Sequence, residues 1–336
     1  MDRSTPKRLA VLVLGTGLIA ILPANAAADQ LAGAAGKKRA KAKVTLVPTP
    51  FSLPGGMSDD KADALSTCPE RTTLLSGGVL SNTPEPAGPP ELDTDIYKSG
   101  PTGNGWFVRY DNDSQSALRP SVQAVCLKNR LKVRGTGGNP KAITKVRRVH
   151  VAFTVPSEAP ATNNGHVAID VVCPKKTMIA GGGASFPAAA SSVDVALEES
   201  GPLGNGWRIR YGNQDIPSEP ATASALCLKR KLKIKKDEGK DKARSKLKRV
   251  DRVVTLRPEG TFLGRTRFTV PCPRKTTIVG GGGRLSPAAP LATTNIQLEE
   301  SGAVGNAWQV TFDNDETVAQ SATVHALCLK NKLKVK

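Results

Sequence analysis

Aromatic residues and histidines are scarce in this chain of 336 residues. Aromatic side chains make up only 4% of the sequence, so any core must be built mostly from Val, Leu, Ile and Ala. The three histidines, His150, His166 and His325, share no common spacing. A Ser-His-Asp arrangement is therefore not repeated along the chain, and we expect no catalytic residues.

Long apolar runs are also missing beyond the first thirty residues, whereas a membrane-spanning helix needs about 20 apolar residues. The N-terminus has the three parts of a secretory signal peptide: a basic start, an apolar stretch at 9–22, and a small-x-small cleavage site at Ala24-Asn25-Ala26. We expect residues 1–26 to be removed and the mature protein to be secreted, without a transmembrane segment. A retained membrane anchor is the alternative.

Acidic residues are few relative to basic ones: 29 Asp and Glu stand against 48 Lys and Arg, which gives a net charge of +19. The excess of basic residues is unevenly distributed along the chain. Residues 126–150 hold eight Lys or Arg and no acid, and residues 227–257 hold fourteen against four acids. Smaller basic runs lie at 37–43 and 328–336, and the remaining chain is mildly acidic. Such segregated charge indicates an anionic partner.

A repeat is the dominant feature that the chain does contain. The phrase GNGW at 103–106 recurs at 204–207, and GNAW follows at 305–308, so the tryptophans Trp106, Trp207 and Trp308 are spaced 101 residues apart. Each copy opens with Cys-Pro and a glycine-containing run, and closes with Ala-x-Cys-Leu-Lys. A period of this length suits one small domain per copy. The expected boundaries are a basic flexible arm at 27–43, repeats at 44–134, 146–235 and 248–336, and linkers at 135–145 and 236–247.

Each copy has the pattern of β-structure. In WFVRY, WRIRY and WQVTF, large apolar residues alternate with mostly polar ones, which is typical of half-buried strands with the tryptophan facing inward. The Asn-Gly pair before Trp106 and Trp207 predicts a type I′ hairpin, and Asn306-Ala307 predicts a different turn in the third copy. We therefore expect an all-β protein of three tandem, small, antiparallel β-sandwich-like domains.

The cysteines are six, an even number that fits disulfide bonding in an exported chain. Each copy owns two cysteines at matching places, so repetition predicts that every bridge closes within its own copy. Each bridge would contribute roughly 4 kcal/mol in the chain-entropy model. The predicted pairs are Cys68 with Cys126, Cys173 with Cys227, and Cys272 with Cys328.

Other candidate sites have simpler structural interpretations. In the pairs Glu198-Glu199 and Glu299-Glu300, adjacent residues of a strand should point to opposite faces and so not converge on a substrate. The glycine runs lack the Lys-Ser/Thr of a phosphate loop and are typical of bulges or close backbone approach. The runs beginning at Asp111 and Asp313 resemble calcium ligands, but Asp and Asn after a strand are common turn formers. We expect no metal and no cofactor.

Alternating lysines and arginines mark the closing strand of each copy. One interpretation is an edge strand protected from aggregation. The other is a binding surface for anionic polymer, without nucleic-acid specificity, because no aromatic residues interleave with the cations. The candidate polyanion-binding residues are Lys128, Arg130, Lys132, Lys229, Lys231, Lys233, Lys330, Lys332 and Lys334.

The order Cys-Pro, Gly-Gly-Gly, Gly-Trp and Ala-x-Cys resembles repeat domains in exported proteins of high-GC Gram-positive bacteria. The resemblance covers all three copies, about four-fifths of the chain. It implies secretion, all-β domains and a disulfide from the Cys-Pro cysteine to the Ala-x-Cys cysteine. No activity is established for that group, so it implies no catalytic or ligand residues.

We thus expect a secreted, non-enzymatic protein that associates with the cell envelope or extracellular anionic polymer through its basic strands and linkers. One alternative is a carbohydrate-binding or adhesin module that uses the loops of variable length, at 79–98, 184–197 and 284–297. A secreted hydrolase is a further alternative, and it would need His166 or His325 beside a carboxylate in a cleft.

Overall fold

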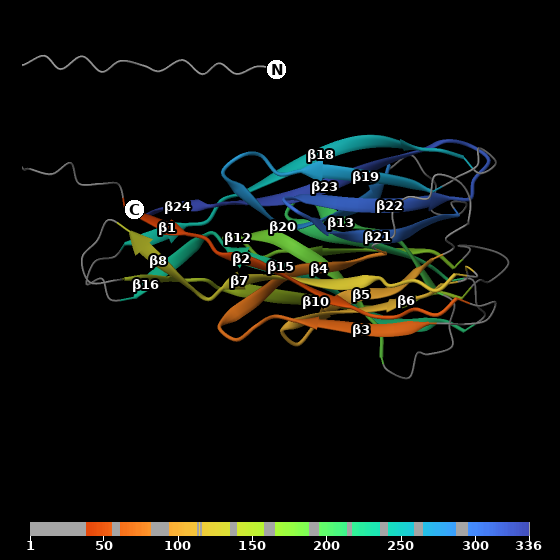
Figure 1. Ribbon diagram of the computed structural model, residues 1–336, viewed down its shortest axis with the longest axis horizontal. Coiled ribbons are helices and arrows are strands. Elements are labelled where there is room, and N and C mark those ends of the chain that lie inside the picture. The colour runs from red at the N-terminus through yellow and green to blue at the C-terminus, as the bar shows by residue number, and fades with distance from the viewer. Residues whose placement is uncertain are drawn as a thin grey trace, which may run out of the picture. The chain divides into compact units, whose positions relative to one another are not determined.

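The structure is a computed structural model, and its described residues are all-β. They are residues 38–55, 61–81, 94–112, 114, 116–134, 140–157, 165–187, 195–213, 217–235, 241–258, 265–286 and 295–335; the predicted signal peptide lies outside them. Residues 37–336 form one compact unit (Figure 1), and every regular element described in it is a β-strand.

Eight strands recur in the same order three times. The first repeat contains β1 Arg39–Lys41, β2 Val44–Pro50, β3 Ala62–Thr67, β4 Thr72–Leu80, β5 Ile96–Thr102, β6 Gly105–Tyr110, β7 Ser121–Lys128 and β8 Arg130–Arg134. The second contains β9 Lys141–Ile143, β10 Val146–Val155, β11 Val167–Val172, β12 Thr177–Ser185, β13 Val195–Leu203, β14 Gly206–Asn213, β15 Glu219–Lys229 and β16 Lys231–Lys235. The third contains β17 Lys242–Arg244, β18 Leu247–Leu256, β19 Thr266–Pro271, β20 Thr276–Leu285, β21 Ile296–Val304, β22 Ala307–Asn314, β23 Gln320–Lys330 and β24 Lys332–Val335.

Each repeat is a small antiparallel sandwich. In the first repeat, β2, β7 and β4 form one layer, β3, β6 and β5 form the other, and β3 and β6 pack against β7. One disulfide joins the two layers of every repeat, with Cα–Cα distances of 5.6, 5.7 and 5.7 Å. The bridges are Cys68–Cys126, Cys173–Cys227 and Cys272–Cys328. The predicted fold class and disulfide pairing are confirmed.

Neighbouring repeats share their sheets. The edge strand β5 pairs with β12 of the second repeat, β13 pairs with β20 of the third, and β21 pairs with β4 of the first. Three six-stranded sheets result, each made of three strands from one repeat and three from the next. The pairing closes on itself, so the three repeats form a ring in which every repeat contacts both others through backbone pairing.

The glycine runs allow this close packing, as the sequence predicted. A Cβ atom on Gly182 would overlap the ring of Trp207, and a Cβ atom on Gly183 would overlap the carbonyl oxygen of Ser99 in the neighbouring repeat. The lack of a side chain at Gly182 therefore leaves room for the indole, and the lack of one at Gly183 allows the two repeats to pair. The tryptophans are buried and donate from Nε1 at 3.0 Å to the hydroxyl seven residues earlier: Trp106 to Ser99, Trp207 to Ser200 and Trp308 to Ser301.

The turn before each tryptophan differs from the prediction. The hairpin closes between Thr102 and Gly105, so Gly103 and Asn104 are its central residues. Positive φ occurs at the glycine alone, with values of 53°, 57° and 56° at Gly103, Gly204 and Gly305. This is the pattern of a type II′ turn, not type I′. Ala307 lies in β22 and not in the turn, so the expected difference in the third copy is also wrong.

The expected linkers and flexible arm contain strands where they are described. β1 lies in the predicted arm 27–43, and β9 and β17 lie in the predicted linkers 135–145 and 236–247. These segments are charged, which favoured a solvated interpretation. However, only the middle residue of a three-residue strand needs to face inward. In each case that residue is an alanine with no exposed surface: Ala40, Ala142 and Ala243.

Candidate polyanion-binding barrel

Six short strands form a closed barrel in the order β1-β24-β17-β16-β9-β8. Every repeat contributes its first and its last strand, so the barrel is shared by all three. In Figure 1 the labelled barrel strands gather on the left, beyond the ends of the longer strands. Apolar side chains fill the interior and are no more than 2% exposed: Ala40, Leu131, Val133, Ala142, Leu232, Ala243 and Leu333.

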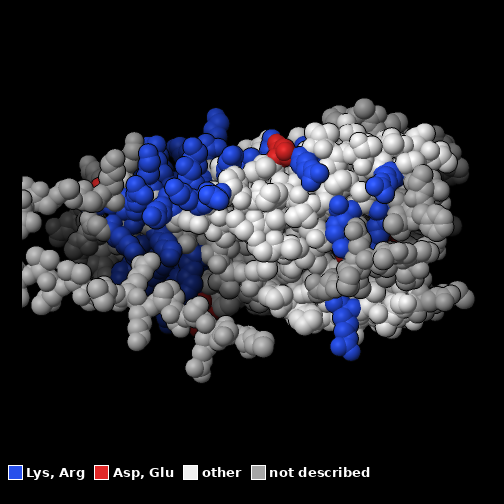
Figure 2. Space-filling model, turned by 45° about the horizontal axis from the view of Figure 1, so that its top comes forward, with Lys and Arg blue, Asp and Glu red and all other residues white. Residues whose placement is uncertain are grey.

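Cations cover the outside of this barrel. Because side chains alternate along a strand, each of these inward apolar residues has an outward Lys or Arg on at least one side. The six strands contain no Asp or Glu. Figure 2 shows Lys and Arg crowded over this end, while most of the other described surface in view is neither acidic nor basic. Lys38 Nζ and Asp241 Oδ2, next to the barrel strands β1 and β17, form an ion pair at 3.0 Å.

All nine candidate polyanion-binding residues lie at this end and are exposed. Three of them, Lys128, Lys229 and Lys330, are the last residues of β7, β15 and β23, where each sandwich meets the barrel. The other six are on β8, β16 and β24: Arg130, Lys132, Lys231, Lys233, Lys332 and Lys334. The structure thus brings together residues from three copies.

The partner strands β1, β9 and β17 were not predicted from the sequence. These contribute the exposed cations Arg39, Lys41, Lys141, Lys242 and Arg244. A short repeated motif could have predicted these strands. In each copy an Ala follows a Lys or Arg, and another Lys comes three residues after that Ala, as in RAKAK, KAITK and KARSK. This motif lies shortly before the first long strand of every copy.

The interpretation of the basic rows as protected sheet edges is wrong. β8 pairs with both β1 and β9, β16 with both β9 and β17, and β24 with both β1 and β17. A strand paired on both sides has no free edge to protect.

Two grooves run between the barrel and the sandwiches. We call the first the β8 groove, because its lining includes Arg130, Lys132 and Arg134 of that strand, and its volume is about 1160 Å³. The second is the β24 groove, which is lined in part by Lys332 and Lys334 and has a volume of about 1180 Å³. No Asp or Glu is among the described residues that line either groove.

One basic residue in each repeat has an unusual backbone conformation, and two of these three residues line the grooves. Arg71, Lys176 and Lys275, each three residues after a disulfide cysteine, have φ values of 60°, 69° and 65°. A non-glycine residue in this left-handed region costs roughly 1–2 kcal/mol. The carbonyl of each residue accepts the N–H of the residue after the Cys-Leu-Lys strand end, at 2.9–3.1 Å. This contact holds Arg71 in the lining of the β8 groove and Lys275 in that of the β24 groove.

The histidines have polar partners but lie outside both grooves. His166 Nδ1 is 2.5 Å from Glu198 Oε1, and His325 Nδ1 is 2.8 Å from Asp251 Oδ1. His150 Nδ1 is 3.0 Å from the hydroxyl of Ser224. The predicted hydrolase alternative requires such a histidine in a cleft, and no His is among the described residues that line either groove.

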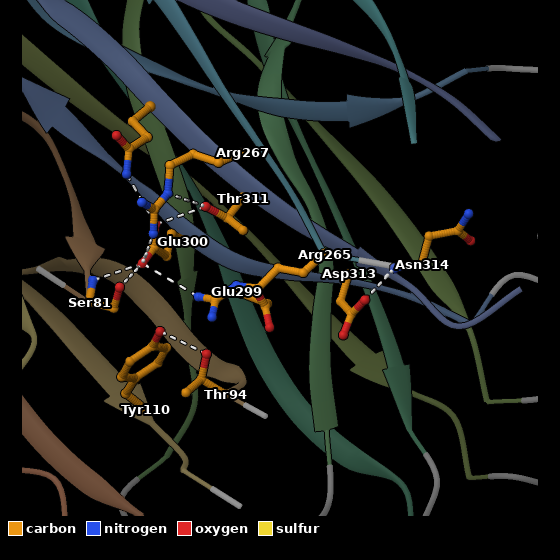
Figure 3. A network of polar contacts seen from close by, with 11 residues as sticks. Ser81, Thr94, Tyr110, Arg265, Arg267, Glu299, Glu300, Thr311, Asp313 and Asn314 are labelled. Carbon is orange, nitrogen blue, oxygen red and sulfur yellow. Dashed lines mark hydrogen bonds and ion pairs between the residues drawn. The ribbon is translucent and has the colours of Figure 1, made fainter. Parts of the chain in front are cut away.

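Glu299 and Glu300 converge on one arginine, contrary to the prediction. A β-bulge between Leu298 and Glu300 breaks the alternation of side chains, and both carboxylates reach Arg265 (Figure 3). Glu299 forms an ion pair with Arg265 Nε, and Glu300 Oε1 lies 3.6 Å from Arg265 Nη2. The two acids are fully buried, and neither lines one of the two grooves. In the other predicted pair, Glu198 forms an ion pair with Arg210 and Glu199 with Arg284.

The surroundings of Glu299 and Glu300 shift the pKa values of the two carboxyl groups in opposite directions. Burial raises the pKa of Glu299 well above its usual value. Burial acts in the same direction on Glu300, but Arg267 and the hydroxyl of Ser81 outweigh it and lower the pKa of that group. Because Ser81 follows β4 of the first repeat, this network (Figure 3) joins the first and third repeats and serves the closure of the ring.

The candidate calcium runs are turn formers in the described residues. Asn112 Nδ2 donates to the carbonyls of Pro54 and Ser116 at 2.7 and 3.0 Å, and Asn213 and Asn314 make the equivalent pair of contacts. Each asparagine thus ties its loop to the end of an earlier strand. The described part of the chain contains no group of three His, Cys, Asp or Glu side chains that could hold a metal ion.

Three intramolecular disulfides place the protein outside the reducing cytoplasm. Within the described residues there is no helix with the length and hydrophobicity to cross a membrane. A scan against protein-family models and a search of curated proteins found no match to this chain.

Proposed function

We propose that this is an exported, non-enzymatic protein that binds anionic polymer of the cell envelope or extracellular matrix through its basic barrel. One observation carries the proposal. Closing strands about 100 residues apart in the sequence meet in a single barrel, whose exposed side chains include cations from all three repeats. The predicted signal peptide and the disulfides support an extracellular site of action.

The electrostatic repulsion among the barrel cations also supports the proposal that they bind an anionic ligand. Like charges held together repel one another and destabilise the compact state. No Asp or Glu in the grooves' described lining offsets the repulsion, and the cations have no sheet edge to protect. A bound polyanion would neutralise them and release its counterions, which is favourable at low salt.

The carbohydrate-binding alternative involves loops that the structure describes only at their ends. Residues 82–93, 188–194 and 287–294 of those loops lie outside the described residues. That alternative stays a prediction, and a glycan array that included uncharged sugars would distinguish it from charge-driven binding.

Affinity for a heparin matrix as a function of salt tests the proposal. The test variant Lys132→Gln/Lys233→Gln removes two exposed barrel cations. The matched control Arg252→Gln/Arg257→Gln removes the same charge from β18 and from the residue that follows it.

We expect the wild type to bind at low salt and to be released by 0.5 M salt, as electrostatic binding requires. The slope of log K against log[salt] should fall by about one for each contacting cation lost in the test variant, and should be unchanged in the control. Absence of binding at low salt, or equal effects of the two variants, would contradict the proposal.

A further inference from the structure

The two grooves are joined by a shared residue. Lys41 of β1 lines both the β8 groove and the β24 groove. We propose that one linear polyanion occupies both grooves and crosses β1 between them. The inference rests on the proposed function and deepens it, because it specifies the form of the ligand: a chain longer than one groove.

The register of the barrel supports a continuous path. β1 lies between β8 and β24, with Arg39 opposite both Arg134 and Lys334, and Lys41 opposite Lys332. Adjacent strands are separated by about 4.8 Å, so β8 and β24 are only about 10 Å apart across β1. Since the exposed residues of β1 are Arg39 and Lys41, a chain that passes from one groove to the other meets cations throughout.

The size of the grooves favours a polymer over a small anion. Each groove exceeds the range of about 300–1,000 Å³ that is typical of small-molecule sites. Neither lining contains a Phe, Tyr or Trp among its described residues, so neither offers a platform on which bases could stack. These features fit a flexible backbone with regularly spaced phosphate, sulfate or carboxylate groups.

Occupation of both grooves by one chain changes the expected affinity. Once the chain is held in one groove, its second segment is at high effective concentration at the other, and overall binding can be 10²–10⁴-fold tighter. A fragment that fits within one groove gains nothing from the second. Binding should therefore depend steeply on chain length at constant charge density.

Heparin fragments of two lengths provide the test. One fragment is short enough for a single groove, the other long enough to span both, and each is titrated calorimetrically into the full protein at low salt. We expect more than one short fragment to bind per protein, but only one long fragment, with about 10²-fold or more higher affinity. The variant Lys41→Gln should weaken the long fragment more than the short one, whereas Arg252→Gln should affect neither.

The outcomes separate the two proposals. If neither fragment binds, the proposed function itself fails. If both fragments bind with equal affinity per site, or if several long fragments bind per protein, the basic barrel still binds polyanion but the single-chain arrangement is refuted.

Discussion

Removal of Arg284 should expose how strongly the ring of repeats depends on its buried ion pairs. Arg284 of β20 forms an ion pair with Glu199 of β13, with Nε and Oε1 3.0 Å apart, across the junction of the second and third repeats. The side chain of Glu199 is 5% exposed. The substitution Arg284→Met keeps an apolar side chain of similar length and leaves this carboxylate buried without its partner.

Loss of one partner of a buried pair costs about 3–5 kcal/mol. For a unit of about 300 residues this corresponds to a decrease in Tm of about 5–8 °C. The matched control is Arg208→Met, which breaks the exposed pair of Arg208 with Asp170; its arginine and aspartate side chains are 31% and 42% exposed. An exposed pair contributes at most about 1 kcal/mol.

The loss should also depend on pH. Burial raises the pKa of Glu199, and Arg284 opposes that effect, so the pKa in the variant is higher still. A carboxyl whose pKa is higher in the folded state destabilises the protein above that pKa, and the effect disappears below the unfolded-state pKa, where both states are protonated. The difference in stability between variant and wild type should therefore shrink as the pH falls from 7 toward about 4.

Denaturant unfolding of the disulfide-intact protein at several pH values measures these differences. The double variant Glu199→Gln/Arg284→Met should lose less stability than Arg284→Met alone, because no buried charge is left. The reasoning is refuted if Arg284→Met costs no more than Arg208→Met, or if its cost stays constant with pH.

Three further predictions concern the packing and the barrel. Gly182→Ala should destabilise the protein by about 1–3 kcal/mol or more through overlap with Trp207, whereas Gly204→Ala has open space and should show only backbone strain of about 1 kcal/mol; thermal melting compares them. Deletion of residues 27–43 from the mature chain should remove β1, leave β8 and β24 each paired on one side only, and lower the salt concentration at which heparin releases the protein. Shared sheets should make the three repeats unfold in one calorimetric transition, and three separate transitions would contradict the ring.

Much of each sandwich could be predicted because its signals are local and repeated. Alternation in WFVRY and its copies identifies the central strand, and two cysteines per copy identify the bridge. The exact turn could not be predicted from the Asn-Gly pair, because the strand register decides which residues are central. With Thr102 paired to Gly105, the positive φ falls on Gly103.

The ring and the barrel depend on contacts between copies, which no single-copy pattern contains. The pairing of Ser99 with Ala184 is one backbone contact between residues that also suit an ordinary strand. The short strands β1, β9 and β17 could not be predicted, because each has a single buried alanine. One buried residue is too few to show the alternation that identifies a strand. Six cations on the barrel strands and the three lysines at the ends of β7, β15 and β23 could still be predicted, since Lys132 and its equivalents alternate with apolar residues over several positions.

The two ends of the described chain are neighbours, since the N–H of Val335 donates to the carbonyl of Lys38 at 3.3 Å. Genetically joining these ends and opening the chain between two other repeats would yield a circular permutant with the same cyclic order. The contacts at the three junctions differ, with Lys98 near the Phe186 ring, Arg284 on Glu199, and Ser81 on Glu300. Any starting repeat is thus compatible with this architecture, but exchanging two repeats would juxtapose mismatched groups.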